Sequence, residues 1–188
     1  MRVFPVNHRP PAPTRLNDQA MPLLYLLRHA KSSWDDPALS DHDRPLAPRG
    51  RQATELMAEH LRRERIAPSL VLCSSAQRAR ETLDAVAPAF GADVEVLVEP
   101  GLYGAPGREL LDRVRALPGS VDSAMLIGHN PAIQDLALEL AGSGEELEPL
   151  AFKYPTGALA TLAFEADWRE LGAGDAELRA FVRPKDLR

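Results

Sequence analysis

The sequence predicts an α/β fold, a three-layer α/β/α sandwich around a mostly parallel central sheet. Short, mainly apolar runs at 23–27, 69–73 and 124–127 fit strands that are buried on both faces. Stretches with helical periodicity lie between these runs, as in a fold that alternates strands and helices. Each run also ends abruptly in polar residues. Right-handed crossovers would bring these polar strand ends to one edge of the sheet.

The length of 188 residues fits one domain, which we place at 21–188. Residues 1–20 contain four prolines and no lasting periodicity, so they are interpreted as a disordered tail. Met21 stands directly before the first strand and could be the true start of the protein.

Composition excludes several classes of function. A net charge of −5 argues against a nucleic-acid partner. The single cysteine excludes an internal disulfide and suits a reducing compartment, so we expect a cytoplasmic protein. The chain has no apolar run long enough to span a bilayer, and no membrane partner is expected. It also lacks the CxxC, HExxH and GxxxxGK patterns, so we expect no cofactor and no metal.

The first half of the chain divides at its prolines. Residues 35–47 are polar and broken by two prolines, which predicts a loop over the end of the first strand. From Pro48 the spacing becomes helical, and one face carries Ala53, Leu56, Met57, His60 and Leu61. After the strand at 69–73, Ser74 or Ser75 is the expected N-cap of the next helix.

The second half repeats the alternation. A strand at 94–98 precedes a helix near 107–117, and the strand at 124–127 runs into Gly-His-Asn-Pro. We expect Asn130 to be the N-cap and Pro131 the first residue of a helix that runs to about 140. Gly142 should end that region, an acidic loop follows, and the last strands are expected near 157–164 and 177–183.

Basic and imidazole side chains follow the strand ends. Arg28 and His29 come directly after the first strand, Arg78 begins the helix after the second, and His129 follows the strand at 124–127. Two guanidinium groups can hold a phosphoryl group by bidentate hydrogen bonds. His29 can attack phosphorus through a neutral ring nitrogen, while His129 can donate to the phosphoryl oxygens.

The loop after His29 adds Lys31, Ser32 and Ser33, whose ammonium and hydroxyl groups suit an oxyanion. We therefore predict that the site binds a phosphorylated substrate.

Two other kinds of chemistry are weighed against this hypothesis. Four residues separate Cys73 from Arg78, whereas cysteine-dependent phosphatases need five, so we interpret Cys73 as a core residue. A metal site built on the two histidines is disfavoured because Arg28 and Arg78 would repel a cation. His60 is expected near the buried face of its helix, and His42 in the loop near the site.

Four motifs in order resemble the histidine phosphatase superfamily, which includes the cofactor-dependent phosphoglycerate mutases: RHAKSSWD from 28, DRPLAPRG at 43–50, SSAQRARET at 74–82 and GHNP at 128–131. RHAKSSW, LYGA and GHNP look most like the SixA-type phosphohistidine phosphatases. The resemblance implies a phosphoglycerate mutase-like fold. It also implies that His29 is the phosphorylated nucleophile, that Arg28 and Arg78 bind the phosphoryl group, and that His129 is the second histidine of the pocket.

The chain departs from its larger relatives at two acidic positions. Asp35 stands where many members have a phosphate-binding Asn, and we count it among the candidate substrate-binding residues with Lys31 and Ser32. Glu99 precedes LYGA in the region where mutases place their catalytic Glu, and it is the candidate general acid.

Within this resemblance the preferred function is hydrolysis of a protein phosphohistidine. We expect the chain to lack the longer insertions that close a mutase over a small metabolite and exclude water. A small-molecule phosphomonoesterase of the same superfamily and a non-catalytic phosphate-binding module are the alternatives. The partner implied is a phosphorylated substrate, which could be a phosphohistidine-bearing protein.

Overall fold

A computed structural model describes residues 21–92 and 94–188, so the tail predicted at 1–20 lies outside the described residues. The strands of this part are β1 (Leu23–Arg28), β2 (Leu70–Ser74), β3 (Glu95–Glu99), β4 (Ser123–Gly128), β5 (Ala141–Ser143), β6 (Leu159–Phe164) and β7 (Ala176–Val182). The α-helices are α1 (Pro48–Arg63), α2 (Gln77–Val86), α3 (Gly107–Arg115), α4 (Ala132–Leu140) and α5 (Leu147–Phe152). Short 3₁₀ turns are η1 (Ala87–Ala89), η2 (Pro100–Leu102), η3 (Trp168–Glu170) and η4 (Pro184–Leu187).

The strands form one seven-stranded sheet in the order β3-β2-β4-β1-β6-β7-β5. β1, β4, β2 and β3 are all parallel neighbours, with Leu26 opposite Leu126 and Cys73 opposite Ile127. β6 is antiparallel to both β1 and β7, and β5 joins the edge parallel to β7. The mostly parallel sheet predicted from the apolar runs is confirmed.

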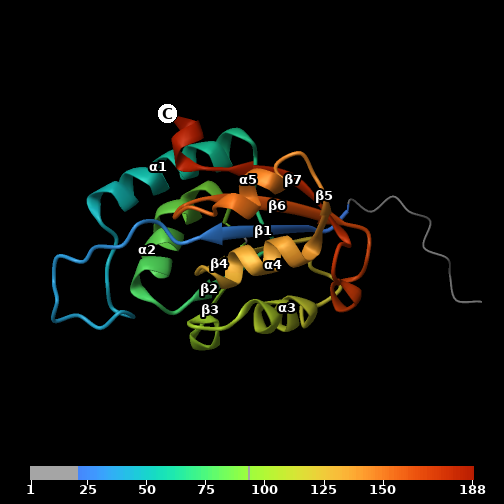
Figure 1. Cartoon of the computed structure of the whole chain (residues 1–188), viewed down its shortest axis with the longest axis horizontal. Coiled ribbons are helices and arrows are strands. Elements are labelled where there is room, and N and C mark those ends of the chain that lie inside the picture. The colour runs from blue at the N-terminus through green and yellow to red at the C-terminus, as the bar shows by residue number, and fades with distance from the viewer. Residues whose placement is uncertain (1–20, 93) are drawn as a thin grey trace, which may run out of the picture.

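Alternate residues of β1 pack into two different cores. Leu24 and Leu26 belong to the larger cluster, which the buried residues of α3, α4 and α5 complete. Tyr25 and Leu27 belong to the smaller cluster, which contains the buried residues of α1 and α2. The sheet therefore separates two helical layers, as Figure 1 shows, and the three-layer sandwich is confirmed.

Two helix starts differ from the prediction by a residue or more. The residue at the N-cap position of α2 is Ala76, without a side-chain cap, because Ser74 is the last residue of β2 and its hydroxyl contacts His129. α4 begins at Ala132 with Pro131 before it, and Asn130 does not cap the helix because its side chain donates to Gln134 and to the carbonyl of Tyr154.

The acidic loop expected after residue 142 contains two elements instead. β5 is only three residues long and is stabilised by pairing with β7. α5 contains Pro149 and forms because Leu150 is fully buried in the larger core cluster, to which α4 also contributes. Both elements depend on tertiary contacts that local sequence patterns do not reveal.

The loop expected at 35–47 is confirmed, and in Figure 1 it extends beyond the tip of the β1 arrow. Its two ends are tied by an isolated bridge between Ser32 and Leu46. Cys73 is fully buried, and burial raises the pKa of its thiol to about 12, which confirms its interpretation as a core residue. Among the helices described, none has the length and apolar character needed to cross a bilayer.

Candidate active site

Parallel strands bring the two predicted histidines together. Arg28 and Gly128 are partners at the ends of β1 and β4, so His29 and His129 follow from neighbouring strands. The amide of His29 donates to the carbonyl of Gly128 at 3.0 Å, and the two imidazole rings lie 4.9 Å apart between centroids. The register of the sheet, rather than any local sequence pattern, therefore sets the spacing of the pair.

The hydrogen bonds of His29 define its tautomer. Nδ1 lies 2.8 Å from the carbonyl oxygen of Ala30, which can only accept, so Nδ1 is assigned the proton. Burial is the main cause that lowers the pKa of His29 to about 3, and the charges of Arg78 and Arg28 act in the same direction. At neutral pH Nε2 therefore carries a lone pair, which is what a nucleophile at phosphorus needs.

Arg78 links the two imidazole rings. Its Nε donates to Nε2 of His29 at 3.3 Å, and its Nη2 donates to Nδ1 of His129, also at 3.3 Å. The side chain is 7% exposed and lies on the first turn of α2. A phosphoryl group held by Arg78 would consequently lie against both histidines.

His129 differs from the freely donating group expected from the sequence. Its Nδ1 accepts from Arg78, and its Nε2 lies 2.8 Å from the hydroxyl of Ser74 at the end of β2. Burial first, and then the charge of Arg78, lower the pKa of His129 to about 4. Donation from this ring into the pocket therefore requires a proton at Nδ1, which a bound phosphoryl dianion would favour.

Arg28 is anchored from below the pocket. Its Nη1 donates to the carbonyl of Tyr154 at 2.6 Å, while its Nε is buried without a protein acceptor. Tyr154 is itself fixed, since its hydroxyl bonds to the backbone of Leu26 and Ala160. A buried guanidinium with an unpaired donor is stabilised by an anion nearby.

The loop at 35–47 adds a carboxylate that the sequence analysis missed. Asp41 accepts from Arg78 Nη2 at 3.0 Å, from Arg44 Nη2 at 2.8 Å and from the hydroxyl of Tyr103 at 2.9 Å. Burial opposes its ionisation, but the hydrogen bond from Tyr103 and the charges of the two arginines keep its pKa below the usual value. Asp41 thus holds both arginines in place.

Arg44 was also missed as an individual residue, although it lies within the DRPLAPRG motif. It is 7% exposed, and its guanidinium stacks 3.4 Å above the ring of the exposed Trp34. Two of these residues lie in motifs that could have identified them, since Arg44 is part of DRPLAPRG and Tyr103 is part of LYGA. Asp41 had no signal, because an acid in a polar loop is typical of a solvated surface.

These groups surround a pocket of about 210 Å³. Four basic side chains and both histidines line it, and no Asp or Glu does. The full lining is Arg28, His29, Lys31, Ser32, Trp34, Arg44, Arg78, His129, Asn130 and Thr156. In the ranges 21–92 and 94–188, no three His, Cys, Asp or Glu side chains are grouped as a metal site requires. The site is therefore arranged for a phosphoryl-sized anion.

Comparison with known proteins agrees with this geometry. Residues 24–103 match the sequence profile of the histidine phosphatase superfamily, branch 1. A protein of Mycobacterium leprae is 36% identical over 165 residues, covering 85% of this chain and 100% of the relative. The chain belongs to the histidine phosphatase superfamily.

Solved structures narrow the type within the superfamily. A SixA-type protein of Nakamurella multipartitia has a TM-score of 0.78 and 30% identity, and the match covers 89% of this chain and 99% of that one. The protein histidine phosphatase SixA complexed with tungstate has a TM-score of 0.72 and 26% identity over 88% and 99% of the two chains. This chain is accordingly a SixA-type member of the histidine phosphatase superfamily, with the phosphoglycerate mutase-like fold of that superfamily.

The structure brings together most of the residues predicted from the superfamily motifs. Arg28, His29, Arg78 and His129 meet in the pocket, and Lys31 and Ser32 line it. Asp35, the third candidate substrate-binding residue, is exposed and does not line the pocket, so the structure does not place it with Lys31 and Ser32.

Glu99 is not brought into this group. Its carboxylate receives three hydrogen bonds of 2.6 to 3.1 Å from Arg113 on α3, and it does not line the pocket. The fork-to-carboxylate geometry holds Glu99 away from the histidines. Two further histidines lie as expected, since His60 is 8% exposed on α1 and His42 bonds to Ser75 beside the site.

Proposed function

We propose that this phosphatase hydrolyses protein phosphohistidine through a phosphorylated His29. The observation that carries the proposal is the state of His29: neutral, with its proton fixed on Nδ1 by Ala30 and its Nε2 beside Arg78. Nε2 forms a bond to phosphorus while the bond from phosphorus to the leaving nitrogen breaks. Arg28 and Arg78 stabilise the charge on the phosphoryl oxygens as this happens.

The second step returns the enzyme to its starting state. Water attacks the phosphorus of phospho-His29, the bond to Nε2 breaks, and Nε2 recovers its lone pair. Both protons of the water remain on the phosphate, which is released as dihydrogen phosphate. Nδ1 keeps its hydrogen bond to Ala30 throughout, so the imidazole stays in one orientation for both steps.

The leaving group explains why a phosphohistidine suits this site better than an ester. An imidazole protonated on its other nitrogen leaves as the neutral ring and needs no further acid. An alkyl or aryl ester needs a proton donor, and Glu99, the candidate for that role, is bonded to Arg113. The SixA relative described as a protein histidine phosphatase supports the same substrate class.

The proposed reaction requires a phosphorylated partner but no cofactor. We propose the cytoplasm as its compartment, because Cys73 is an unpaired thiol.

The test compares phosphate release from a phosphohistidine peptide, 3-phosphoglycerate and an aryl phosphate. The proteins are the wild type, His29→Ala, and His60→Gln as a control histidine outside the pocket.

We expect the peptide to be preferred, and activity to be lost only in His29→Ala. Preference for a small ester would favour a phosphomonoesterase instead. Absence of turnover on every substrate would favour a phosphate-binding module.

A further inference from the structure

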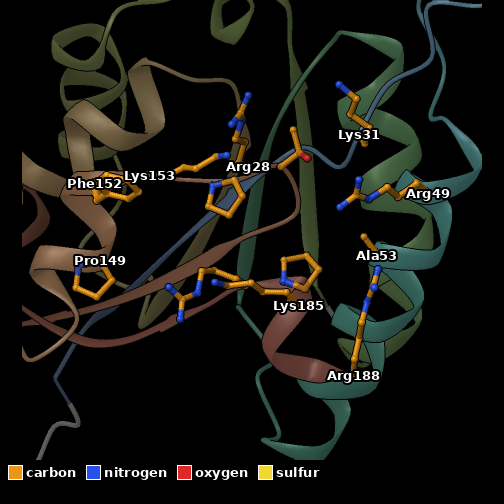
Figure 2. Close-up of a pocket in the computed structure, with 13 residues that line it drawn as sticks. Arg28, Lys31, Arg49, Ala53, Pro149, Phe152, Lys153, Lys185 and Arg188 are labelled. Atoms are coloured by element: carbon orange, nitrogen blue, oxygen red, sulfur yellow. The ribbon is translucent and has the colours of Figure 1, made fainter.

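A second and larger pocket, of about 600 Å³, adjoins the phosphoryl pocket. The two share Arg28, Lys31 and Thr156 in their walls. Figure 2 shows Arg49 and Ala53 of α1 on one side, Phe152 and Lys153 at the end of α5 on the other, and Lys185 of η4 between them. We call this pocket the basic groove. Its lining is Arg28, Lys31, Arg49, Ala53, Pro149, Phe152, Lys153, Pro155, Thr156, Arg183, Pro184, Lys185 and Arg188.

The charge of the basic groove is opposite to that of the whole chain. Seven of the thirteen lining residues are Lys or Arg and none is Asp or Glu, in a chain with a net charge of −5. Arg183 is paired with Asp186 at 2.6 Å. The other six cations have no carboxylate within salt-bridge distance in the part of the chain that the structure describes. Such a cluster produces a local positive potential that attracts an anionic partner.

Exposed aromatic side chains flank both pockets. Phe152 is 89% exposed at the edge of the basic groove, and Trp34 is 70% exposed at the phosphoryl pocket. Pro149, Pro155 and Pro184 add apolar wall to the basic groove. A small polyanion would contact the cations and leave Phe152 in water. A peptide can cover the aromatic ring while its acidic side chains meet the cations, and aromatic and Arg residues are those that dominate protein interfaces.

We infer that the basic groove docks an acidic segment of the phosphoprotein substrate, adjacent to the residue whose phosphoryl group enters the site at His29. This inference rests on the proposed function, because it assumes a protein substrate. Because Arg28 and Lys31 line both pockets, the acidic segment should lie only a short distance along the substrate's sequence from the phosphorylated residue. The groove then sets substrate preference, while the phosphoryl pocket performs the reaction.

The test uses two phosphohistidine peptides that are identical except that four Glu residues flanking the phosphohistidine in one are Gln in the other. The enzymes are the wild type, the double variant Lys153→Glu/Lys185→Glu, Phe152→Ala and Arg169→Glu. Arg169 is the matched control, an exposed arginine in η3, which follows β6 at the opposite edge of the sheet.

We expect the wild type to have a KM for the acidic peptide that is lower by about tenfold at low salt, since each exposed ion pair contributes a few-fold. The double variant should abolish that preference without an equal change in kcat. Phe152→Ala should raise the KM of both peptides, and Arg169→Glu should behave as the wild type. High salt should reduce the preference because these charges are exposed.

Equal KM values for the two peptides in the wild type, or a preference that survives the double variant, would overturn the docking inference. Inhibition by tripolyphosphate that the double variant relieves, together with equal peptide KM values, would identify the groove as a small-polyanion site instead. Hydrolysis of phosphoimidazole by the wild type would show that the proposed function holds even if the docking inference fails. If the wild type hydrolyses neither phosphoimidazole nor either peptide, the proposed phosphohistidine phosphatase activity itself is refuted.

Discussion

Acidification should lower the free energy of unfolding of this protein, in part because His29 is buried as a neutral imidazole. Burial lowers the pKa of His29 from 6.5 to about 3 in the folded state. Below pH 6.5 the unfolded chain takes up a proton at this residue, whereas the folded protein does not until about pH 3. The free energy of unfolding must therefore fall as the pH falls through this window. Above pH 6.5 both states are neutral at His29, and its contribution is fully present.

The magnitude follows from the width of the window. One pH unit corresponds to about 1.4 kcal/mol for a single proton. Titration of His29 in the unfolded chain should therefore lower the free energy of unfolding by about 2 kcal/mol between pH 8 and pH 5. The side chain is 7% exposed, so solvent screening removes little of this. His129, with a pKa lowered to about 4, should add a loss of similar size.

Urea unfolding at pH 8, 7, 6 and 5 in phosphate-free buffer measures the effect, with the fluorescence of the buried Trp168 as one probe. The variant His29→Asn cannot titrate at this position, and all other ionisable groups are the same in both proteins. Its stability should fall by about 2 kcal/mol less than that of the wild type between pH 8 and pH 5. Equal losses in the two proteins would refute the assignment of His29 as a buried, neutral imidazole.

Three further substitutions test individual contacts. Asp41→Asn weakens the contacts that hold Arg78 and Arg44 in place, so inorganic phosphate should inhibit about threefold more weakly; tighter inhibition would mean that the charge of Asp41 chiefly opposes phosphate binding. Glu99→Gln should leave kcat on a phosphohistidine peptide and on an aryl phosphate within about twofold of the wild type, whereas a loss confined to the aryl phosphate would restore its role as general acid. Gly50→Ala would place a Cβ 2.1 Å from the carbonyl oxygen of Lys31, so urea unfolding should show a loss of about 1 to 3 kcal/mol, and unchanged stability would contradict this packing.

Much of the fold was predictable because its central strands are buried on both faces. The run at 23–27 predicted β1, since residues packed on two sides must all be apolar. α5 was not predictable, because a six-residue helix with an internal proline forms only where Leu150 packs against the core. β5 was missed for the same reason, as three residues carry no period and pair only because β7 lies beside them.

The site divides in the same way. His29 and His129 were predictable because each follows a strand whose end the parallel sheet brings to one edge. Asp41 was not predictable, because its partners depend on the path of a loop without secondary structure. Ser74 was one of the two residues expected to cap a helix, with Ser75, and instead contacts His129, because β2 continues one residue further than its apolar run.

Trapping the phosphorylated enzyme would test directly whether His29 is the nucleophile. The wild type is mixed with an excess of phosphohistidine peptide, quenched rapidly in alkali, in which phosphohistidine survives, and digested for mass spectrometry of the peptide that contains His29. We expect one phosphoryl group on that peptide, on a ring nitrogen of His29, and none in His29→Ala. A phosphoryl group on another residue, or turnover of the peptide by His29→Ala, would refute His29 as the nucleophile.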